Sequence, residues 1–126
     1  MKRDLELVRE LLLALENEQA HFDSTIPLTI GQPPLALPGR SNQEIAYHIR
    51  IMTQGDLISM GGIDDDGVTI HKYYGFRWAG HEFLDDVRDP EIWRKTKAAA
   101  GKVGGASIGF IWEIAKLELK TKLGLP

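Results

Sequence analysis

One group of polar side chains is spaced so that a helix could present it to another molecule. Four residues recur at intervals of four, three and four and so share one helical face: Gln43, Tyr47, Arg50 and Gln54. In the DNA major groove, Gln pairs with adenine and Arg with guanine, while a Tyr hydroxyl can reach phosphate. This stripe is a candidate DNA-reading surface, and the alternative is a solvated or protein-contacting helix face.

A basic cluster lies further along the chain and consists of Arg94, Lys95, Lys97 and Lys102. Residues 1–90 hold 8 Lys/Arg against 15 Asp/Glu, whereas residues 91–126 hold 7 against 3. Because neutralising phosphates supplies most nucleic-acid affinity, this cluster is expected to hold phosphates if the protein binds double-stranded DNA. An anionic lipid surface or the acidic region of another copy would suit the cluster as well.

The acidic run Asp64-Asp65-Asp66-Gly67 is typical of a tight turn rather than of a calcium site. Calcium loops of the EF-hand type need spaced ligands and a closing Glu, and neither is present. At the tip of a hairpin, three aspartates would repel DNA phosphates. They favour a protein partner over DNA.

Catalytic chemistry has little support in this sequence. His81 and Asp85, four residues apart with Glu82 beside them, could contact one metal ion, but a hydrogen bond between His81 and Asp85 is the simpler expectation. There is no cysteine, no phosphate loop and no nucleophile elbow. We therefore expect a non-enzymatic protein without a metal or cofactor, and we expect His48 to be a half-buried packing residue.

The elements that must position these residues can be read from periodicity and capping signals. Residues 4–18 form an amphipathic helix with Asp4 as the cap, and Ser41 with Glu44 forms a capping box on a second helix that ends at Gly55. The remaining expected elements are a short strand at 25–30, a hairpin of strands 57–63 and 68–78, and helices at 80–88, 90–100 and 106–123.

Two apolar patterns carry expectations about packing. In the second hairpin strand, one face is expected to hold Val68, Ile70, Tyr74, Phe76 and Trp78. The last helix has a second apolar face, nearly opposite its main one, formed by Phe110, Ile114 and Leu117. This second face is expected to form a homodimer interface, and the alternative is burial within a monomer.

The order of these elements resembles that of winged helix-turn-helix domains, with 41–54 as recognition helix and 57–78 as wing. It departs from them because the proline-rich stretch 27–38 leaves little room for one of their helices. The expected fold class is α+β, with a winged-helix-like domain at 1–100 and a C-terminal helix, for oligomerisation or packing, at 101–126.

Four segments also resemble a family of small uncharacterised proteins from bacteria, phages and other mobile elements, classified as a domain of unknown function. They are MKRDLELVRELLLALE, EIAYHIRIMTQGDLI, GHEFLDDVRDPEIWRKTK and the terminal KLGL. The resemblance implies a mobile-element context and brings no catalytic residues with it.

The composition narrows the remaining possibilities. The 126 residues are 43% hydrophobic with a net charge of −3, which is typical of a globular protein with a true core. No apolar run is long enough to span a membrane, so a cytoplasmic location is expected. The leading hypothesis is a homodimeric DNA-binding or regulatory protein, and the alternative is a protein–protein adaptor on the same scaffold.

Overall fold

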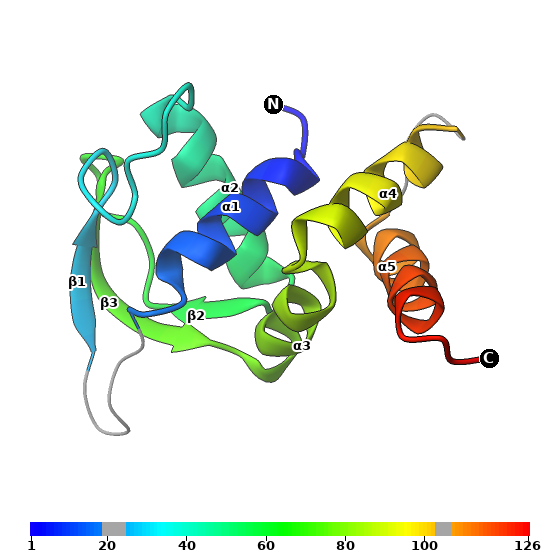
Figure 1. Ribbon diagram of the computed structural model, residues 1–126. Coiled ribbons are helices and arrows are strands. Elements are labelled where there is room, and N and C mark those ends of the chain that lie inside the picture. Colours follow the sequence, from blue (N-terminus) through cyan, green and yellow to red (C-terminus); the bar gives the residue numbers. More distant parts are fainter. Residues whose placement is uncertain (19–24, 103–106) are drawn as a thin grey trace. The chain divides into compact units, whose positions relative to one another are not determined.

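The computed structural model describes residues 1–18, 25–102 and 107–126 and divides into two compact units (Figure 1). The first unit is Met1–His81 and the second is Glu82–Pro126. The described residues form five helices and a three-stranded antiparallel sheet, so the expected α+β class is confirmed. The expected domain boundary after residue 100 stays a prediction.

Helix α1 (Leu5–Leu15) begins where the sequence predicts. The Asp4 carboxylate accepts hydrogen bonds from the backbone N–H groups of Glu6 and Leu7, which have no partner within the helix. The helix ends three residues earlier than expected. Its buried face is formed by Leu7, Val8, Leu11, Leu12 and Leu15.

Strand β1 (Ile26–Thr29) is followed by turns and not by a helix over residues 30–41. Helix α2 (Asn42–Gln54) then starts with the predicted capping box, in which Ser41 and Glu44 each bond the other's backbone N–H. In the first unit α1 and α2 lie next to each other on one face of the sheet (Figure 1). The residues of α2 buried there are Ile45, His48, Ile49 and Met52.

The end of α2 differs in one detail from the expectation. Gly55 is the C-cap, but its φ of −86° is ordinary, and the left-handed residue is Asp56 with φ of 62°. The Leu57 N–H then bonds the Met52 carbonyl at 2.9 Å, and the Asp56 N–H bonds that of Thr53 at 3.2 Å. This is a Schellman ending, in which the aspartate accepts the conformation that glycine usually takes.

Strands β2 (Ile58–Met60) and β3 (Thr69–Phe76) form the predicted hairpin, shorter than expected, and β1 pairs with the other edge of β3. The sheet order is therefore β1–β3–β2. The turn is confirmed, because the Gly67 N–H bonds the Asp64 carbonyl at 2.9 Å. Between the strands, residues 61–68 form a loop, part of which lies beside α2.

The expected face of β3 is wrong beyond Ile70. Ile26 pairs with Tyr73 and Leu28 pairs with Ile70. The paired positions are thus two residues apart on β1 but three residues apart on β3, which leaves one extra residue in β3. The extra residue reverses the alternation of side chains, so Ile70 and Tyr73 are both buried. Tyr74 is half exposed as a result, and Trp78 lies beyond the strand, 77% exposed.

Helix α3 (Trp78–Val87) begins two residues earlier than expected and spans the division between the units. The residue before α3 is tied to the segment between α2 and β2, since the Arg77 N–H bonds the Leu57 carbonyl at 2.9 Å. Gly80 lies directly against this carbonyl, and a Cβ there would be only 2.1 Å from the oxygen. Only glycine allows this approach of two backbones.

The second unit contains helices α4 (Pro90–Gly101) and α5 (Ile108–Lys122), which pack against each other. Pro90 occupies the first turn of α4 as predicted, behind Asp89 as the cap. The Trp112 ring of α5 meets Phe83 edge to face at 5.5 Å, and its indole N–H donates to the Asp86 carboxylate. Gly104 and Gly105 of the predicted break lie outside the described residues.

No helix in the described ranges has both the length and the apolar character needed to cross a membrane.

Candidate binding groove

The predicted stripe lies on the exposed face of α2. Gln43, Arg50 and Gln54 are exposed, while Tyr47 is half-buried with its ring against the edge of His48, 5.3 Å between centroids. The capping box and the buried stripe on the opposite face set this orientation. What the stripe contacts stays a prediction.

Beside the stripe lies a groove of about 350 Å³ between α2 and the 61–68 loop. We call it the α2–loop groove. Four of its side chains are half-buried and apolar over much of their surface: Ala46, Tyr47, Ile63 and Val68. The polar lining comes from Asn42, Gln43, Arg50, Asp64 and Asp66, with Gly67 completing it. Sequence reasoning named residues on both walls and missed the groove, because only the fold brings the loop beside α2.

The loop wall carries the negative charge. Asp66 accepts hydrogen bonds from Val68 N–H, Thr69 N–H and the Thr69 hydroxyl, and these hold the pKa of its carboxyl below the usual value, the hydroxyl most of all. It is therefore ionised at neutral pH. The Asp64 carboxylate lies 2.6 Å from His71 Nε2.

Asp65 stands apart from its two neighbours. It is exposed, and its side chain has no hydrogen bond or ion pair among the described residues. Asp64, Asp65 and Asp66 also line a second, open hollow of about 490 Å³ with Ile63. The carboxylates of the loop thus face solvent on two sides.

The helix wall has the opposite character. Arg50 is exposed and forms no ion pair with any described residue. Asn42 and Gln43 add amide groups, each of which can both donate and accept. The groove is therefore bipolar, with donors and one cation on α2 and carboxylates on the loop.

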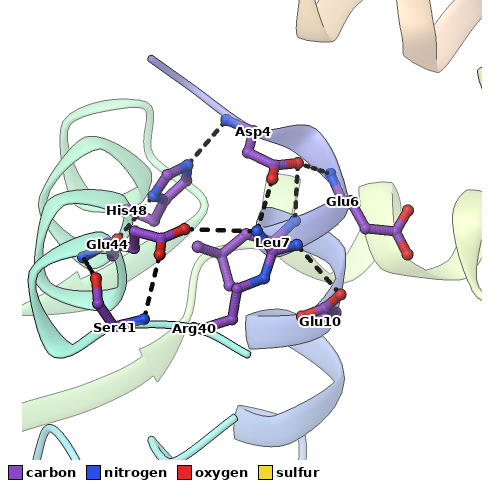
Figure 2. Close-up of polar contacts among 8 residues, drawn as sticks. All are labelled: Asp4, Glu6, Leu7, Glu10, Arg40, Ser41, Glu44 and His48. Carbon is purple, nitrogen blue, oxygen red and sulfur yellow. Dashed lines mark hydrogen bonds and ion pairs between the residues drawn. The ribbon is translucent and has the colours of Figure 1, made fainter. Parts of the chain in front are cut away.

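A partly buried ion cluster links α1 to the start of α2 (Figure 2). The Arg40 guanidinium, only 18% exposed, lies 2.7 Å from Asp4 Oδ2, 3.4 Å from Glu10 Oε1 and 3.6 Å from Glu44 Oε2. Burial raises the pKa of Asp4, but the hydrogen bond and charge of Arg40, with the N–H groups of α1, lower it further, so the net shift is downward. Arg40 is shielded by these carboxylates, and its role is structural.

His48 belongs to the same network and is fully buried, not half-buried as the sequence suggested. Its Nε2 accepts a hydrogen bond from the Asp4 backbone N–H at 2.9 Å, and its Nδ1 donates to the Glu44 carbonyl at 2.8 Å. This pairing assigns the neutral tautomer with its proton on Nδ1. Both ring nitrogens are satisfied within the fold, so His48 links α1 to α2.

The basic cluster lies in the second unit, with three residues on α4 and Lys102 as the C-cap of that helix, and all four residues are exposed. Lys95 pairs with Glu91 at 3.2 Å, and the Lys97 ammonium lies over the Trp93 ring at 5.8 Å. Part of the cluster's charge is therefore used within α4. Arg94 and Lys102 complete the cluster on the exposed surface.

The second apolar face of α5 is partly open to solvent. Phe110 is 49% exposed and Leu117 is 62% exposed, while Ile114 is half-buried. The main face buries Ile111 and Ala115. The expected dimer interface thus has the exposure that it requires, and its partner stays a prediction.

The candidate metal ligands on α3 do not converge. The His81 ring packs on Phe76 at 5.0 Å, and Asp85 pairs with Arg88 at 3.4 Å. The expected hydrogen bond between His81 and Asp85 is absent, although both residues lie in the described part of the chain. Within the described ranges no three His, Asp or Glu side chains gather where they could hold a metal ion.

Comparison with known proteins places this α+β chain in a family. The family model described as "Hypothetical protein (DUF2513)" matches residues 2–107, so the chain belongs to the DUF2513 family. The resemblance to an uncharacterised family is thereby confirmed. An uncharacterized protein of Haemophilus influenzae is 27% identical over 99 residues, which cover 77% of this chain and 76% of that protein. No solved structure matches the chain.

Proposed function

We propose that this protein is a non-enzymatic adaptor, in which the α2–loop groove of a winged-helix-like unit contacts another protein. The observation that carries this proposal is the bipolar lining of the groove, with the carboxylates of the loop beside the exposed stripe of α2. It is the alternative that the sequence left open beside DNA binding.

The winged-helix-like assignment is supported by connectivity. In the first unit α2 leads directly into the β2–β3 hairpin, and β1 pairs with the far edge of β3. A recognition helix followed by a wing has this arrangement. The turns over 30–41 stand where a winged helix has another helix, which makes the assignment one of likeness in topology.

Electrostatics favour a protein over DNA as the partner. Residues 1–81 hold 7 Lys/Arg against 11 Asp/Glu. Any molecule that lies along Tyr47 and Arg50 within the groove also meets Asp64 and Asp66. DNA would bring phosphates against these carboxylates, whereas a protein segment can offer cations to one wall and acceptors to the other.

The second candidate is the DNA-binding regulator. It is favoured by the exposed Gln43, Tyr47, Arg50 and Gln54 stripe, with the basic cluster on α4 as a site for phosphates. In both versions we propose a cytoplasmic homodimer held by the Phe110, Ile114 and Leu117 face of α5, with an origin in a phage or mobile element. Neither version uses a metal or cofactor.

Two measurements on the full chain separate the candidates. The first is fluorescence anisotropy of a mixed-sequence DNA duplex at about 50 and about 200 mM salt, where a DNA binder shows affinity that falls steeply with salt. The adaptor proposal expects flat anisotropy at both salt concentrations. Binding that weakens in this way, and weakens further in Arg50→Ala, would overturn it.

The second measurement is affinity capture from a lysate of the cells that encode the protein. A partner held by the groove should be lost with Ala46→Glu, which places a charge on the groove floor, and retained with Gln54→Glu. Gln54 is the matched control because it lies on the same helix and outside the groove. A set of captured proteins that is the same for both variants would contradict a role for the groove.

A further inference from the structure

The two walls of the α2–loop groove differ enough to define the chemistry of their partner. We propose that the groove binds an extended peptide segment in which a Lys or Arg stands next to an apolar residue. This inference rests on the proposed adaptor function and names its ligand class. The inference is supported by the different chemistry of the three parts of the groove: the loop wall, the floor and the helix wall.

The carboxylates of the loop wall favour a cationic group on the ligand. Asp64 and Asp66 line this wall, and the hydrogen bonds of the turn hold Asp66 ionised. Asp65, which lines the adjoining hollow, has no partner of its own among the described residues. One neighbouring basic group is His71 of β3, which pairs with Asp64 and is 66% exposed. Lys72 follows it, with its side chain beside Gly61 and outside the lining of the groove and the hollow. None of the residues that line the loop wall or the adjoining hollow is a Lys or Arg.

The apolar floor favours the aliphatic part of a ligand side chain. Ala46, Tyr47, Ile63 and Val68 are all half-buried, so each still offers apolar surface to a ligand. A Lys or Arg side chain can lie along such a surface with its charged end in water or against a carboxylate. The Tyr47 ring adds an aromatic edge or face to the same floor.

The helix wall offers hydrogen-bond donors and amide groups, which are complementary to a peptide backbone. Arg50 has no ion pair within the described chain, and its guanidinium offers several donors. Asn42 and Gln43 stand on the same wall and can meet both the C=O and the N–H groups of an extended chain. A simple amine or a metal ion would contact only the carboxylates of the loop wall. A basic peptide can contact both walls.

The inference can be tested with NMR on the full-length, isotope-labelled protein. The probe is the capped tripeptide acetyl-Leu-Arg-Leu-amide, titrated to about 5 mM because short peptides bind weakly, and acetyl-Leu-Glu-Leu-amide is its matched control. We expect the basic peptide to shift amide signals of residues 42–50 and 63–68, and the acidic peptide to leave them in place.

Two variants test the charge of the loop wall. Asp64→Asn, which neutralises a carboxylate that lines the groove, should weaken binding of the basic peptide about threefold, the size of effect that one exposed charge pair gives. Asp56→Asn is the matched control, because Asp56 is exposed, lies outside the groove and has a left-handed conformation that Asn tolerates. It should leave the affinity unchanged.

The outcomes distinguish this inference from the function on which it rests. Equal shifts with both peptides, or no shifts with either, would overturn the basic-peptide assignment while a groove-dependent partner in the capture experiment still supports the adaptor. If a short DNA duplex shifts the 42–54 signals instead, both proposals fail together.

Discussion

The Asp4 carboxylate both caps helix α1 and pairs with Arg40, the residue that precedes the cap of α2. Its Oδ1 accepts the N–H groups of Glu6 and Leu7 at the start of α1, and its Oδ2 accepts the Arg40 guanidinium (Figure 2). Its own backbone N–H donates to His48. A residue at the very start of a helix thereby determines how α1 meets α2, the helix that carries the stripe.

We predict that Asp4→Ala lowers the free energy of unfolding by about 1–2 kcal/mol, because the helix loses its cap and Arg40 loses its shortest ion pair. Urea denaturation at neutral pH measures the change. Asp65→Ala is the control, since Asp65 has no partner in the described chain, and it should leave stability within about 0.5 kcal/mol of the native protein. An equal loss in both variants would contradict a special role for Asp4.

The same comparison has a pH dependence of known sign. Arg40 and the N–H groups of α1 outweigh burial and lower the pKa of Asp4 in the folded state below its ordinary value of 3.8. The carboxylate therefore stabilises the fold fully above that value and loses this contribution as pH falls through the lower, folded pKa. The stability gap between native protein and Asp4→Ala should narrow at about pH 3 compared with about pH 7. A gap that widens would contradict the network.

Tyr73 offers the opposite case, a polar group that the fold does not use. The side chain is 1% exposed, and its hydroxyl has no hydrogen-bond partner among the described residues. Burial, with the charge of Glu18, raises the pKa of this hydroxyl. The phenol is therefore neutral and unpaired in the core.

We predict that Tyr73→Phe raises the free energy of unfolding by about 1 kcal/mol, because the variant no longer buries an unpaired hydroxyl. Tyr73→Ala, which removes the ring as well, should instead lower it by about 3–5 kcal/mol. Thermal and urea denaturation of the two variants test this ordering. A clear loss of stability in Tyr73→Phe would mean that the hydroxyl has a partner.

At the scale of elements, the contact between the end of α2 and the start of α3 depends on one missing side chain. The Leu57 carbonyl accepts the Arg77 N–H and leaves no room for a Cβ on Gly80. This contact joins the hairpin to the helix that follows it. Strand and helix can approach so closely only through glycine.

We predict that Gly80→Ala destabilises the protein by about 1–3 kcal/mol, the usual cost of overpacking, although alanine favours helices more than glycine does. Gly109→Ala is the matched control in α5, where a Cβ would meet nothing closer than the Ser107 hydroxyl at 3.9 Å. There the helix propensity should dominate and stability should rise by about 0.5–1 kcal/mol. Denaturation curves of the pair show whether close contact or propensity decides.

For the whole molecule, the open question of assembly rests on α5. Phe110 and Leu117 leave large apolar surfaces in water, and Ile114 lies between them on the same face. Packing against the same face of a second copy of the chain would remove this apolar surface from water.

We predict that light scattering reports about twice the chain mass of 14.1 kDa at micromolar concentration. The double substitution Phe110→Glu with Leu117→Glu should return a monomer of unchanged helix content, because buried like charges oppose association. Lys116→Glu on the exposed surface of α5 is the control and should leave the dimer intact. A native protein that is monomeric throughout would contradict the dimer.

Local signals in the sequence determined most of the elements. The caps Asp4 and Ser41 with Glu44 predicted the starts of α1 and α2, because a cap acts on N–H groups within three residues. Pro90 predicted the start of α4, because its fixed φ suits the first turn of a helix. The Asp-Gly turn predicted the hairpin for the same reason. The family resemblance also followed from the sequence alone.

Only the tertiary structure decided how residues distant in sequence meet. The extra residue in β3 reversed the faces of Tyr73 and Tyr74, because alternation along a strand depends on pairing with its neighbours. Arg40 and His48 found their partners across the contact of α1 with α2. The α2–loop groove likewise exists only after folding, since its walls come from a helix and a loop whose separation in the sequence carries no signal of contact.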